Sequence, residues 1–391
     1  MNDTPSTVIL DAARTPHGKF LGSLADVSAV GLGATALEGI LDRTAVESGS
    51  VDWVGLGNAV SAGIGQVPAR QVALAGGLPD DTAATTINEA SGSGLRAIAL
   101  AADRIDAGRV DVAVAGGIES MSNTPFLARD VRKGKRMGNS ELVDSMIRDS
   151  LWDRQYDAHM GELTEDLVGE YDLSREAQDE YALESHRRAV EAVEEGAFDA
   201  ETVPVDVDGE AFDTDEGPRA DTSLEALASL DPAFREDGTV TAGNASDLSD
   251  GAGCVLVADE DAAREMGEEP MARIVDYAVA YRDPKWFGLS VGDAVERLLE
   301  SNDLSVDDVG MFELNEAFAA QMVHVRDRLG IAHEKLNPHG GAVALGHPIG
   351  ASGGILTTTL VYAMERERID QGVVGMSIGG GGGIALLVAR A

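Results

Sequence analysis

Two histidines stand in a glycine-rich segment near the end of the chain, residues 337–353, and both are suited to proton transfer. Histidine takes up and releases protons near neutral pH more readily than other side chains, and a loop beside glycine and proline is a poor place for core packing. We therefore predict a functional role for His347. For His339, a functional role and a capping or core role are equally supported.

A serine at an expected helix start is the candidate nucleophile. Residues 88–96 place Ser91 among small residues, directly before a run rich in alanine and leucine. Backbone N–H groups and the helix macrodipole stabilise negative charge at such a start, so an anion at Ser91 would be favoured there. From this segment alone, the simpler interpretation is that Ser91 or Ser93 only caps the helix.

Two further segments are candidates for stabilising a developing negative charge. Residues 379–383 are five successive glycines between two expected strands, whereas a tight hairpin needs two at most. The excess indicates backbone that lines a substrate and offers N–H groups as an oxyanion hole. No Gly-Lys-Ser/Thr follows, so this is not a phosphate loop. Asn315, at the end of an apolar run, either orients a water or donates to an oxyanion, or it caps a helix; the segment supports both equally.

The elements that would position these residues alternate between strands and helices. Apolar runs predict strands at 8–10, 51–58, 110–116, 253–258, 272–277, 311–314, 372–378 and 384–389, and helical spacing predicts helices at 29–43, 67–75, 93–107, 174–195, 291–301, 316–329 and 353–366. This alternation predicts a parallel α/β sheet, and the last two strands, 372–378 and 384–389, are expected to form a hairpin. Helix starts bracketed by glycine recur at 91–94 and 350–353, each followed by a helix, a strand and a Gly-rich turn. We interpret the recurrence as an internal duplication of one α/β unit.

The middle of the chain differs in composition from the parts that flank it. Between about 121 and 248 charges are dense, and a long polar helix and an acidic loop are expected. We therefore predict an N-terminal half at 1–120 plus about 241–262, an insertion at 121–240, and a C-terminal half at 263–391.

The charge balance is strongly acidic. The chain has 391 residues and 44% hydrophobic content, enough for one large or two ordinary domains. Its 68 acidic and 30 basic residues give a net charge of -38, and only five of the basic residues are lysines. Because salt screens the self-repulsion of such a surface, we predict adaptation to a salty cytoplasm; an ordinary acidic enzyme is the alternative. A nucleic-acid partner is not expected, since binding phosphates needs clustered Lys and Arg.

Cysteine usage and hydropathy predict a cytoplasmic protein. Cys254 is the only cysteine, which excludes an intramolecular disulfide and a cysteine-based metal cluster and fits a reducing interior. Residues 1–7 do not resemble a signal peptide, and the longest apolar stretches, such as 384–388, are strand-length, far short of a membrane span. No metal site is predicted.

Taken together, these motifs resemble the thiolase family, and most of all its acetyl-CoA acetyltransferase and β-ketothiolase branch. The segments that carry the resemblance, in family order, are 13–16 with 18–20, 65–71, 116–122, 159–161, 239–246, 315–318 and 346–348. The resemblance implies the thiolase fold: two duplicated α/β halves in a five-layered αβαβα core, with the insertion as a cover and tetramerisation loop region. It implies acyl-CoA substrates, no cofactor beyond their coenzyme A, and a homo-oligomer built as a dimer of dimers. Some archaeal thiolases also pair with a small OB-fold or zinc-ribbon partner subunit.

The resemblance also implies roles for individual residues. Ser91 stands at the nucleophile position, where His347 would activate it, and Asn315, through a water, would share an oxyanion hole with His347. The N–H groups of Ser91 and Gly379 would form a second oxyanion hole. Ser377 falls at the position of the family's second cysteine, the acid/base of the condensation. The implied substrate-binding residues are His159 near the acyl group, Ser246 on the pantetheine arm, Arg219 at a coenzyme A phosphate, and Phe318.

The chain departs from the family pattern because both family cysteines are serines. A serine hydroxyl is a weaker nucleophile than a thiolate and needs an adjacent base. Three explanations compete: a native Ser91–His347 pair, an engineered substitution that traps a complex, or a relative that only binds acyl-CoA. The double replacement argues against a single trapping substitution, and the intact glycine loops argue against decay. We hypothesise that His339 supplies the acid/base that Ser377 lacks.

The predicted activity is reversible Claisen condensation or thiolysis of a β-ketoacyl-CoA through an acyl group on Ser91. The alternative is a non-catalytic acyl-CoA-binding subunit of a larger complex. The sequence does not distinguish acyl chain lengths or physiological directions. It also does not distinguish sterol-lipid precursor synthesis, polyhydroxyalkanoate storage and fatty-acid breakdown.

Overall fold

The structure is a computed structural model that describes residues 7–391. Residues 1–6 lie outside the described residues. The prediction that residues 1–7 are not a signal peptide falls mostly on this segment. Among the described residues, no helix is long and apolar enough to cross a membrane.

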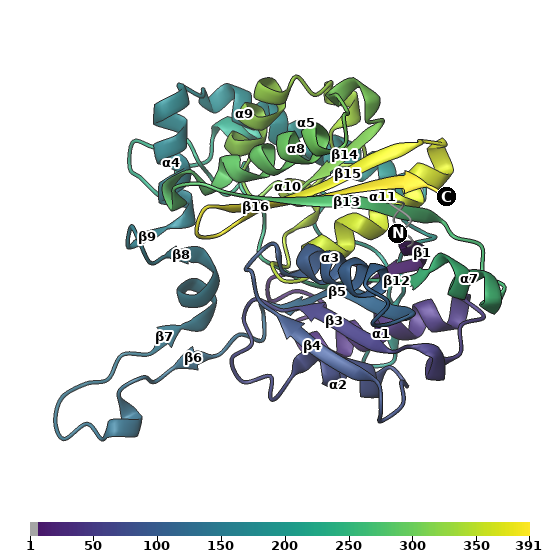
Figure 1. Cartoon of the computed structure of the whole chain (residues 1–391). Coiled ribbons are helices and arrows are strands. Elements are labelled where there is room, and N and C mark those ends of the chain that lie inside the picture. Colours follow the sequence, from purple (N-terminus) through teal and green to yellow (C-terminus); the bar gives the residue numbers. More distant parts are fainter. Residues whose placement is uncertain (1–6) are drawn as a thin grey trace.

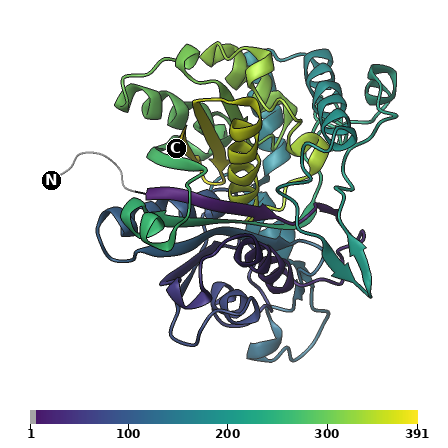
Figure 2. The ribbon, with the colours of Figure 1, turned by 90° about the vertical axis from the view of Figure 1, so that its right-hand side faces the viewer.

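Ten strands form one mixed sheet that divides into two halves. The order is β4-β3-β5-β12-β1 in the first half and β13-β16-β15-β14 in the second, with the short β2 beside β12. The strands are β1 (Thr7–Arg14), β2 (Gly18–Lys19), β3 (Trp53–Gly57), β4 (Ala83–Ile87), β5 (Val112–Ser120), β12 (Ser249–Asp259), β13 (Ala272–Tyr281), β14 (Met311–Leu314), β15 (Gln371–Ile378) and β16 (Gly382–Arg390). Figure 2 shows β1, in purple, running between the two halves, where it pairs with both β12 and β13.

The two halves repeat one topology. In the first, β3 is parallel to β5, β5 is antiparallel to β12, and β12 is antiparallel to β1. In the second, β14, β15, β16 and β13 follow the same sequence of pairings. A single parallel bridge from Phe312 to Leu336 takes the place that β4 holds beside β3. The predicted duplication is therefore present in the topology, and the predicted hairpin of β15 and β16 is confirmed. The prediction of a parallel sheet is wrong, because one strand in each half, β12 or β16, runs antiparallel to both of its neighbours.

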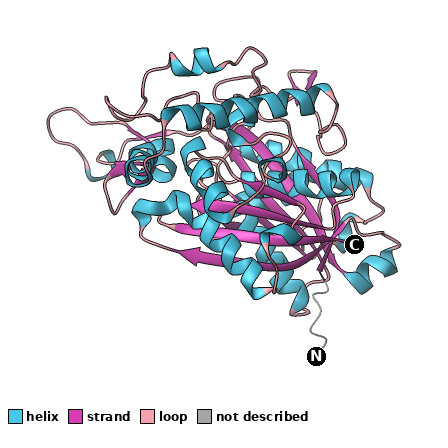
Figure 3. Ribbon diagram, turned by 90° about the horizontal axis from the view of Figure 1, so that it is seen from above, coloured by secondary structure: helices cyan, strands magenta, loops and turns pink. Residues whose placement is uncertain are grey.

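Helices and sheet halves stack in five layers. Helices α1 (Ala29–Arg43) and α2 (Pro68–Ala75) pack with the outer face of the first half, and α8 (Ser290–Ser301) and α9 (Ala319–Leu329) with that of the second. Between the halves lie α3 (Ser93–Asp106) and α11 (Ser352–Glu367), as Figure 1 shows. Figure 3 shows the strands surrounded by helices when the molecule is seen from above. Twelve of the 16 residues of α11 are buried, as expected of a helix with a sheet on either side. The thiolase fold expected from the sequence is confirmed.

The segment between β5 and β12 forms a separate group of helices and short hairpins. Its elements are β6 (Phe126–Leu127), β7 (Val143–Asp144), β8 (Trp152–Asp153), β9 (Ala158–His159), α4 (Met160–Tyr171), α5 (Arg175–Glu194), β10 (Val205–Val207), β11 (Glu210–Phe212) and α6 (Leu224–Ala228). The strands β6 and β7 belong to an arm that projects from the body in Figure 1. The remaining short helices are α7 (Glu260–Met266), after β12, and α10 (Ala342–Leu345), before α11. The boundaries predicted for the insertion and the two halves stay a prediction.

Candidate active site

One pocket collects most of the residues singled out in the sequence. It has a volume of about 320 Å³ and is lined by both halves of the fold and by the segment between β5 and β12. Seven predicted site residues line it: Ser91, His159, Ser246, Phe318, His347, Ser377 and Gly379. Aromatic and aliphatic side chains make up much of the rest, including Phe234, Phe287 and Leu248. A pocket of this size and apolar character suits a small acyl group on a longer chain.

Ser91 lies in a sharp turn between β4 and α3. The residue before it, Ala90, has a φ of +48°, a left-handed conformation that few residues other than glycine adopt. Such strain at a strand-to-helix turn is typical of a side chain held out toward a ligand. Ser91 does not cap the helix, because the N-cap residue is Gly92 and it is Ser93 whose hydroxyl bonds the turn. The capping interpretation of Ser91 is therefore wrong.

The hydroxyl of Ser91 meets the imidazole of His347. Ser91 Oγ and His347 Nε2 are 3.0 Å apart, although 256 residues separate them in the chain. The helices that follow the two residues touch backbone to backbone: a Cβ on Gly353 would lie 2.1 Å from Leu95 N. Glycine at this position is thus needed for α3 and α11 to approach, and the approach brings the two loops together. The side chain of Glu119, on β5, accepts a hydrogen bond from Gly350 N at 2.9 Å and so ties the histidine loop to the first half.

His347 is held by partners on both of its ring nitrogens. Nδ1 is 2.6 Å from Ser352 Oγ, and this hydroxyl donates to Pro348 O at 3.1 Å. Because the Ser352 hydroxyl uses its only proton on that carbonyl, Nδ1 must carry a proton and donate a hydrogen bond to Ser352 Oγ. Nε2 then has a free lone pair, which faces the Ser91 hydroxyl and, at 3.3 Å, Asn315 Nδ2. Burial lowers the pKa of His347 to about 3, so the imidazole is neutral across the physiological range.

His159 has the opposite arrangement. It is the N-cap residue of α4, and its Nδ1 accepts a hydrogen bond from Gly161 N at 3.1 Å. Nε2 must therefore carry the proton of the neutral ring, which burial favours by lowering the pKa of His159. The ring stacks on Phe234, with 4.8 Å between centroids. His159 is thus fixed as a hydrogen-bond donor in the pocket, whereas His347 is fixed as an acceptor.

The glycine run has only partly the role expected of it. Gly380 and Gly381 have φ of +84° and +86° and form the turn between β15 and β16. A Cβ on Gly383 would lie 2.0 Å from Ser290 O, so this glycine permits close packing against α8. Gly379 alone of the five lines the pocket, beside the Ser91 turn. Ser377, on the preceding strand, also lines the pocket, and its hydroxyl donates to Gly288 O at 3.2 Å.

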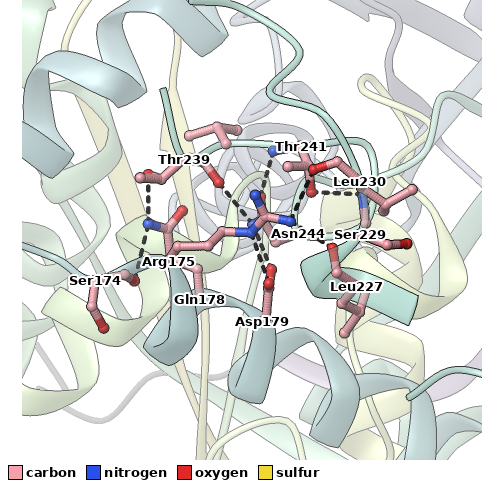
Figure 4. A network of polar contacts seen from close by, with 12 residues as sticks. Ser174, Arg175, Gln178, Asp179, Leu227, Ser229, Leu230, Thr239, Thr241 and Asn244 are labelled. Atoms are coloured by element: carbon pink, nitrogen blue, oxygen red, sulfur yellow. Dashed lines mark hydrogen bonds and ion pairs between the residues drawn. The ribbon is translucent and has the colours of Figure 1, made fainter. Parts of the chain in front are cut away.

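The wall that carries Ser246 is fixed by a polar network, shown in Figure 4. Arg175 and Asp179 of α5 form an ion pair at 2.7 Å, and Asp179 accepts a hydrogen bond from Asn244 Nδ2 at 2.9 Å. Asn244 Oδ1 in turn accepts from Thr241 N at 2.8 Å. The segment 239–246 is thus fastened to a helix of the insertion. Ser246 N donates to Ala317 O at 3.0 Å, next to Phe318, so both residues hold their places on the pocket wall.

The hypothesis that His339 is the second acid/base is contradicted. Its Nε2 lies 2.9 Å from Glu367 and 2.7 Å from Arg366, both at the C-terminal end of α11. His347 contacts Ser352 at the opposite end of that helix. At a rise of about 1.5 Å per residue, the two ends are about 20 Å apart. The imidazole of His339 therefore cannot reach a substrate held at Ser91.

Arg219 lies beside the main pocket and lines a neighbouring one. This second pocket, of about 200 Å³, shares Ala242 and Asp247 with the first and is also lined by His186. Arg219 is about half exposed and forms an ion pair with Asp247 at 3.2 Å. Burial and the charge of Arg219 lower the pKa of His186 to about 4, so the guanidinium is the positive group of this pocket.

Sequence reasoning missed Ser352, which holds the catalytic candidate His347. A serine at a helix start normally indicates a cap, and nothing in its spacing marks it as a partner of His347. Among residues 7–391 no group of three or more histidine, cysteine, aspartate or glutamate side chains is arranged to hold a metal.

Comparisons with known proteins agree with the geometry. Residues 7–261 match the family profile described as thiolase, N-terminal domain, and residues 268–390 that described as thiolase, C-terminal domain. An acetyl-CoA acetyltransferase of Pseudomonas aeruginosa is 47% identical over 98% of this chain and 99% of its own length. One of Escherichia coli is 44% identical, with 98% of each chain covered. The crystal structure of the Bacillus anthracis acetyl-CoA acetyltransferase, 41% identical, superposes with a TM-score of 0.97 over 100% of both chains.

Proposed function

The chain belongs to the thiolase family, and on that premise we propose that it is an acyl-CoA C-acyltransferase that forms and cleaves β-ketoacyl-CoA through an ester on Ser91. The observation that carries the proposal is the 3.0 Å contact between Ser91 Oγ and His347 Nε2 in a pocket of 320 Å³. A hydroxyl needs a base within this distance to act as a nucleophile.

The first half-reaction transfers the acyl group to serine. His347 Nε2 takes the Ser91 proton while Oγ attacks the thioester carbonyl, and the N–H groups of Ser91 and Gly379 stabilise the oxyanion. The carbon–sulfur bond then breaks, and the proton on Nε2 passes to the leaving coenzyme A thiolate. The proton on Nδ1, held by Ser352, is not moved.

The second half-reaction forms the carbon–carbon bond. We propose that His347, neutral again, takes the α-proton of a second acyl-CoA, because Ser377 has no base strength of its own and His339 is out of reach. The resulting enolate, stabilised by Asn315 through a water, attacks the ester carbonyl. The ester carbon–oxygen bond breaks, and the proton on Nε2 returns to Ser91 Oγ. Ser377 contributes a hydroxyl that contacts the substrate.

The remaining pocket residues support binding of coenzyme A thioesters. His159, as a fixed N–H donor, suits the thioester carbonyl oxygen, and Ser246 and Phe318 suit the pantetheine arm. Arg219 and its neighbouring pocket would receive a phosphate of the coenzyme A nucleotide. No further cofactor is required by this chemistry.

The activity is tested by thiolysis of acetoacetyl-CoA with coenzyme A at high salt, with S91A as the matched control. Turnover by the wild type and none by S91A is expected. A folded wild type that binds acyl-CoA without turnover would instead favour the rival interpretation, a non-catalytic acyl-CoA-binding subunit. The observation that favours this alternative is that Ser91 and Ser377 stand where the family has its two cysteines.

We propose further that the protein is a halophilic, cytoplasmic, archaeal-type homo-oligomer. Its net charge of -38 and five lysines support activity at high salt. Exposed apolar residues on the projecting arm, Phe126, Val131, Met137 and Leu142, support contact with a second copy. Light scattering at high salt, alone and with small OB-fold or zinc-ribbon candidates, tests a dimer of dimers and the need for a partner subunit.

A further inference from the structure

A buried carboxyl group behind His347 has no role in the mechanism above. Glu313, the third residue of β14, is 1% exposed, and neither of its carboxyl oxygens has a hydrogen-bond partner in the protein. An unpartnered buried carboxyl group is unfavourable for folding by several kcal/mol if charged. The presence of Glu313 in the core is therefore not explained by a contribution to stability.

Glu313 shares a small cavity with Asn315. The two residues are two apart along an extended segment, so their side chains point to the same face of the sheet. Both line a cavity of about 20 Å³, together with Ser352. A cavity of this size holds roughly one water molecule when its walls are polar.

Only one of the two polar atoms of the Asn315 amide has a hydrogen-bond partner. Its Nδ2 lies 3.3 Å from His347 Nε2, whereas its Oδ1 is buried without a partner. An amide whose oxygen has no partner can turn over, which would point the oxygen at His347 and remove a donor from the active site. Some group in the cavity must fix the amide orientation.

The charged neighbours of the cavity do not neutralise Glu313. Arg14 lines the cavity, but it is engaged by Asp215 at 2.8 Å and by Glu201. His17 also lines it and lies 2.9 Å from Asp215. Burial, together with nearby acidic groups, raises the pKa of Glu313 well above its usual range. The carboxyl group is therefore protonated and can donate a hydrogen bond.

We propose that Glu313 is a positioning residue that, as a neutral carboxylic acid and through one buried water, fixes the Asn315 amide with Nδ2 toward the active site. The acid O–H donates to the water, and the water donates to Asn315 Oδ1. The expected effect of Glu313 on kcat rests on the proposed function, whereas its protonation and its hydrogen bonds do not.

Three variants test the proposal. In E313Q the side-chain amide retains a neutral donor of similar shape, so kcat should stay within about threefold of the wild type. In E313L the donor is lost, and kcat should fall roughly 10- to 100-fold with KM little changed, as for a small misplacement of a catalytic group. Because Leu removes an unpaired carboxyl group from the core, E313L should melt no lower than the wild type. D11N is the matched control: Asp11 is another buried carboxyl group, bonded to Tyr362 away from the pocket, and its loss should leave kcat unchanged.

An infrared measurement tests the protonation state without reference to activity. The difference between wild-type and E313Q spectra at neutral pH should contain the C=O band of a protonated carboxylic acid, shifted in D2O. A carboxylate band instead, an E313L variant as fast as the wild type, or an E313Q variant as slow as E313L, would each overturn the proposal. A wild type without thiolysis would refute the proposed function, while the infrared band would still decide whether Glu313 is neutral.

Discussion

Removal of the Ser352 hydroxyl should impair catalysis far more than it impairs folding. In the wild type, His347 Nδ1 donates to Ser352 Oγ at 2.6 Å, and this bond keeps the lone pair of Nε2 directed at Ser91. In S352A the buried Nδ1–H has no partner, which is unfavourable by about 1–3 kcal/mol. The ring relieves this by moving its proton to Nε2, where it blocks deprotonation of Ser91. A population shift of that size lowers kcat roughly 5- to 150-fold.

The assay is thiolysis of acetoacetyl-CoA, with kcat and KM measured separately. T357V is the matched control, because Thr357 lies on the same helix, is fully buried, and also donates to a backbone carbonyl four residues earlier, Gly353 O at 2.7 Å. T357V should lose a similar amount of stability but keep its kcat. Selective ¹⁵N labelling of histidine reads the tautomer of His347 directly. Equal kcat for S352A and T357V, or an unchanged tautomer in S352A, would refute the role of Ser352.

Further predictions concern the other candidate residues. S91C should raise the thiolysis rate, because a thiolate is the stronger nucleophile; a slower S91C, measured in the same assay, would mean that the pocket is built for oxygen. H339A should leave kcat unchanged and alter the free energy of unfolding by about 1 kcal/mol or less, since it removes contacts with Glu367, Arg366 and Phe198 that lie away from the pocket; a slower H339A would restore His339 to the mechanism. His347, with its pKa lowered to about 3, should cause no fall in kcat between pH 8 and 5, and a fall in kcat with a midpoint near 6.5 would contradict its burial. Between pH 6.5 and about 3, His347 binds a proton in the unfolded chain but not in the folded one, so the free energy of unfolding falls as the pH falls through this range. H347N should reduce the slope of the free energy of unfolding against pH by about 1.4 kcal/mol per pH unit there, as acid unfolding measures.

Much of the fold could be predicted because its periodic signals are strong. The spacing of apolar residues placed α1 at 29–43, where the structure has it, and the Ala- and Leu-rich runs located α3 and α11. The strand β4 was not predicted, since Ala83–Ile87 is a half-exposed edge strand with threonines in place of a continuous apolar run. The hairpin of β15 and β16 was predicted correctly, whereas the antiparallel direction of β12 was missed, because alternation of strands and helices says nothing about the direction of the strand that follows the insertion.

The candidate site was predicted where a motif fixes the backbone and missed where tertiary packing decides. Glycines at helix starts correctly marked the place where Ser91 and His347 meet, because the helices must touch there. His339 was assigned wrongly because eight residues of separation from His347 were taken as closeness in space. The intervening segment, which contains the short helix α10, leads the chain from one end of α11 to the other. Ser352 and Glu313 gave no signal, since their roles depend on what lies across the sheet.

The most direct measurement is peptide mapping by mass spectrometry after brief incubation with acetyl-CoA at high salt and an acid quench. A serine activated by His347 predicts an acetyl group on the peptide that contains Ser91, absent from S91A and greatly reduced in H347N. A wild-type protein that turns over acetoacetyl-CoA while Ser91 stays unmodified, or carries the acetyl group on another residue, would contradict the pairing of Ser91 with His347.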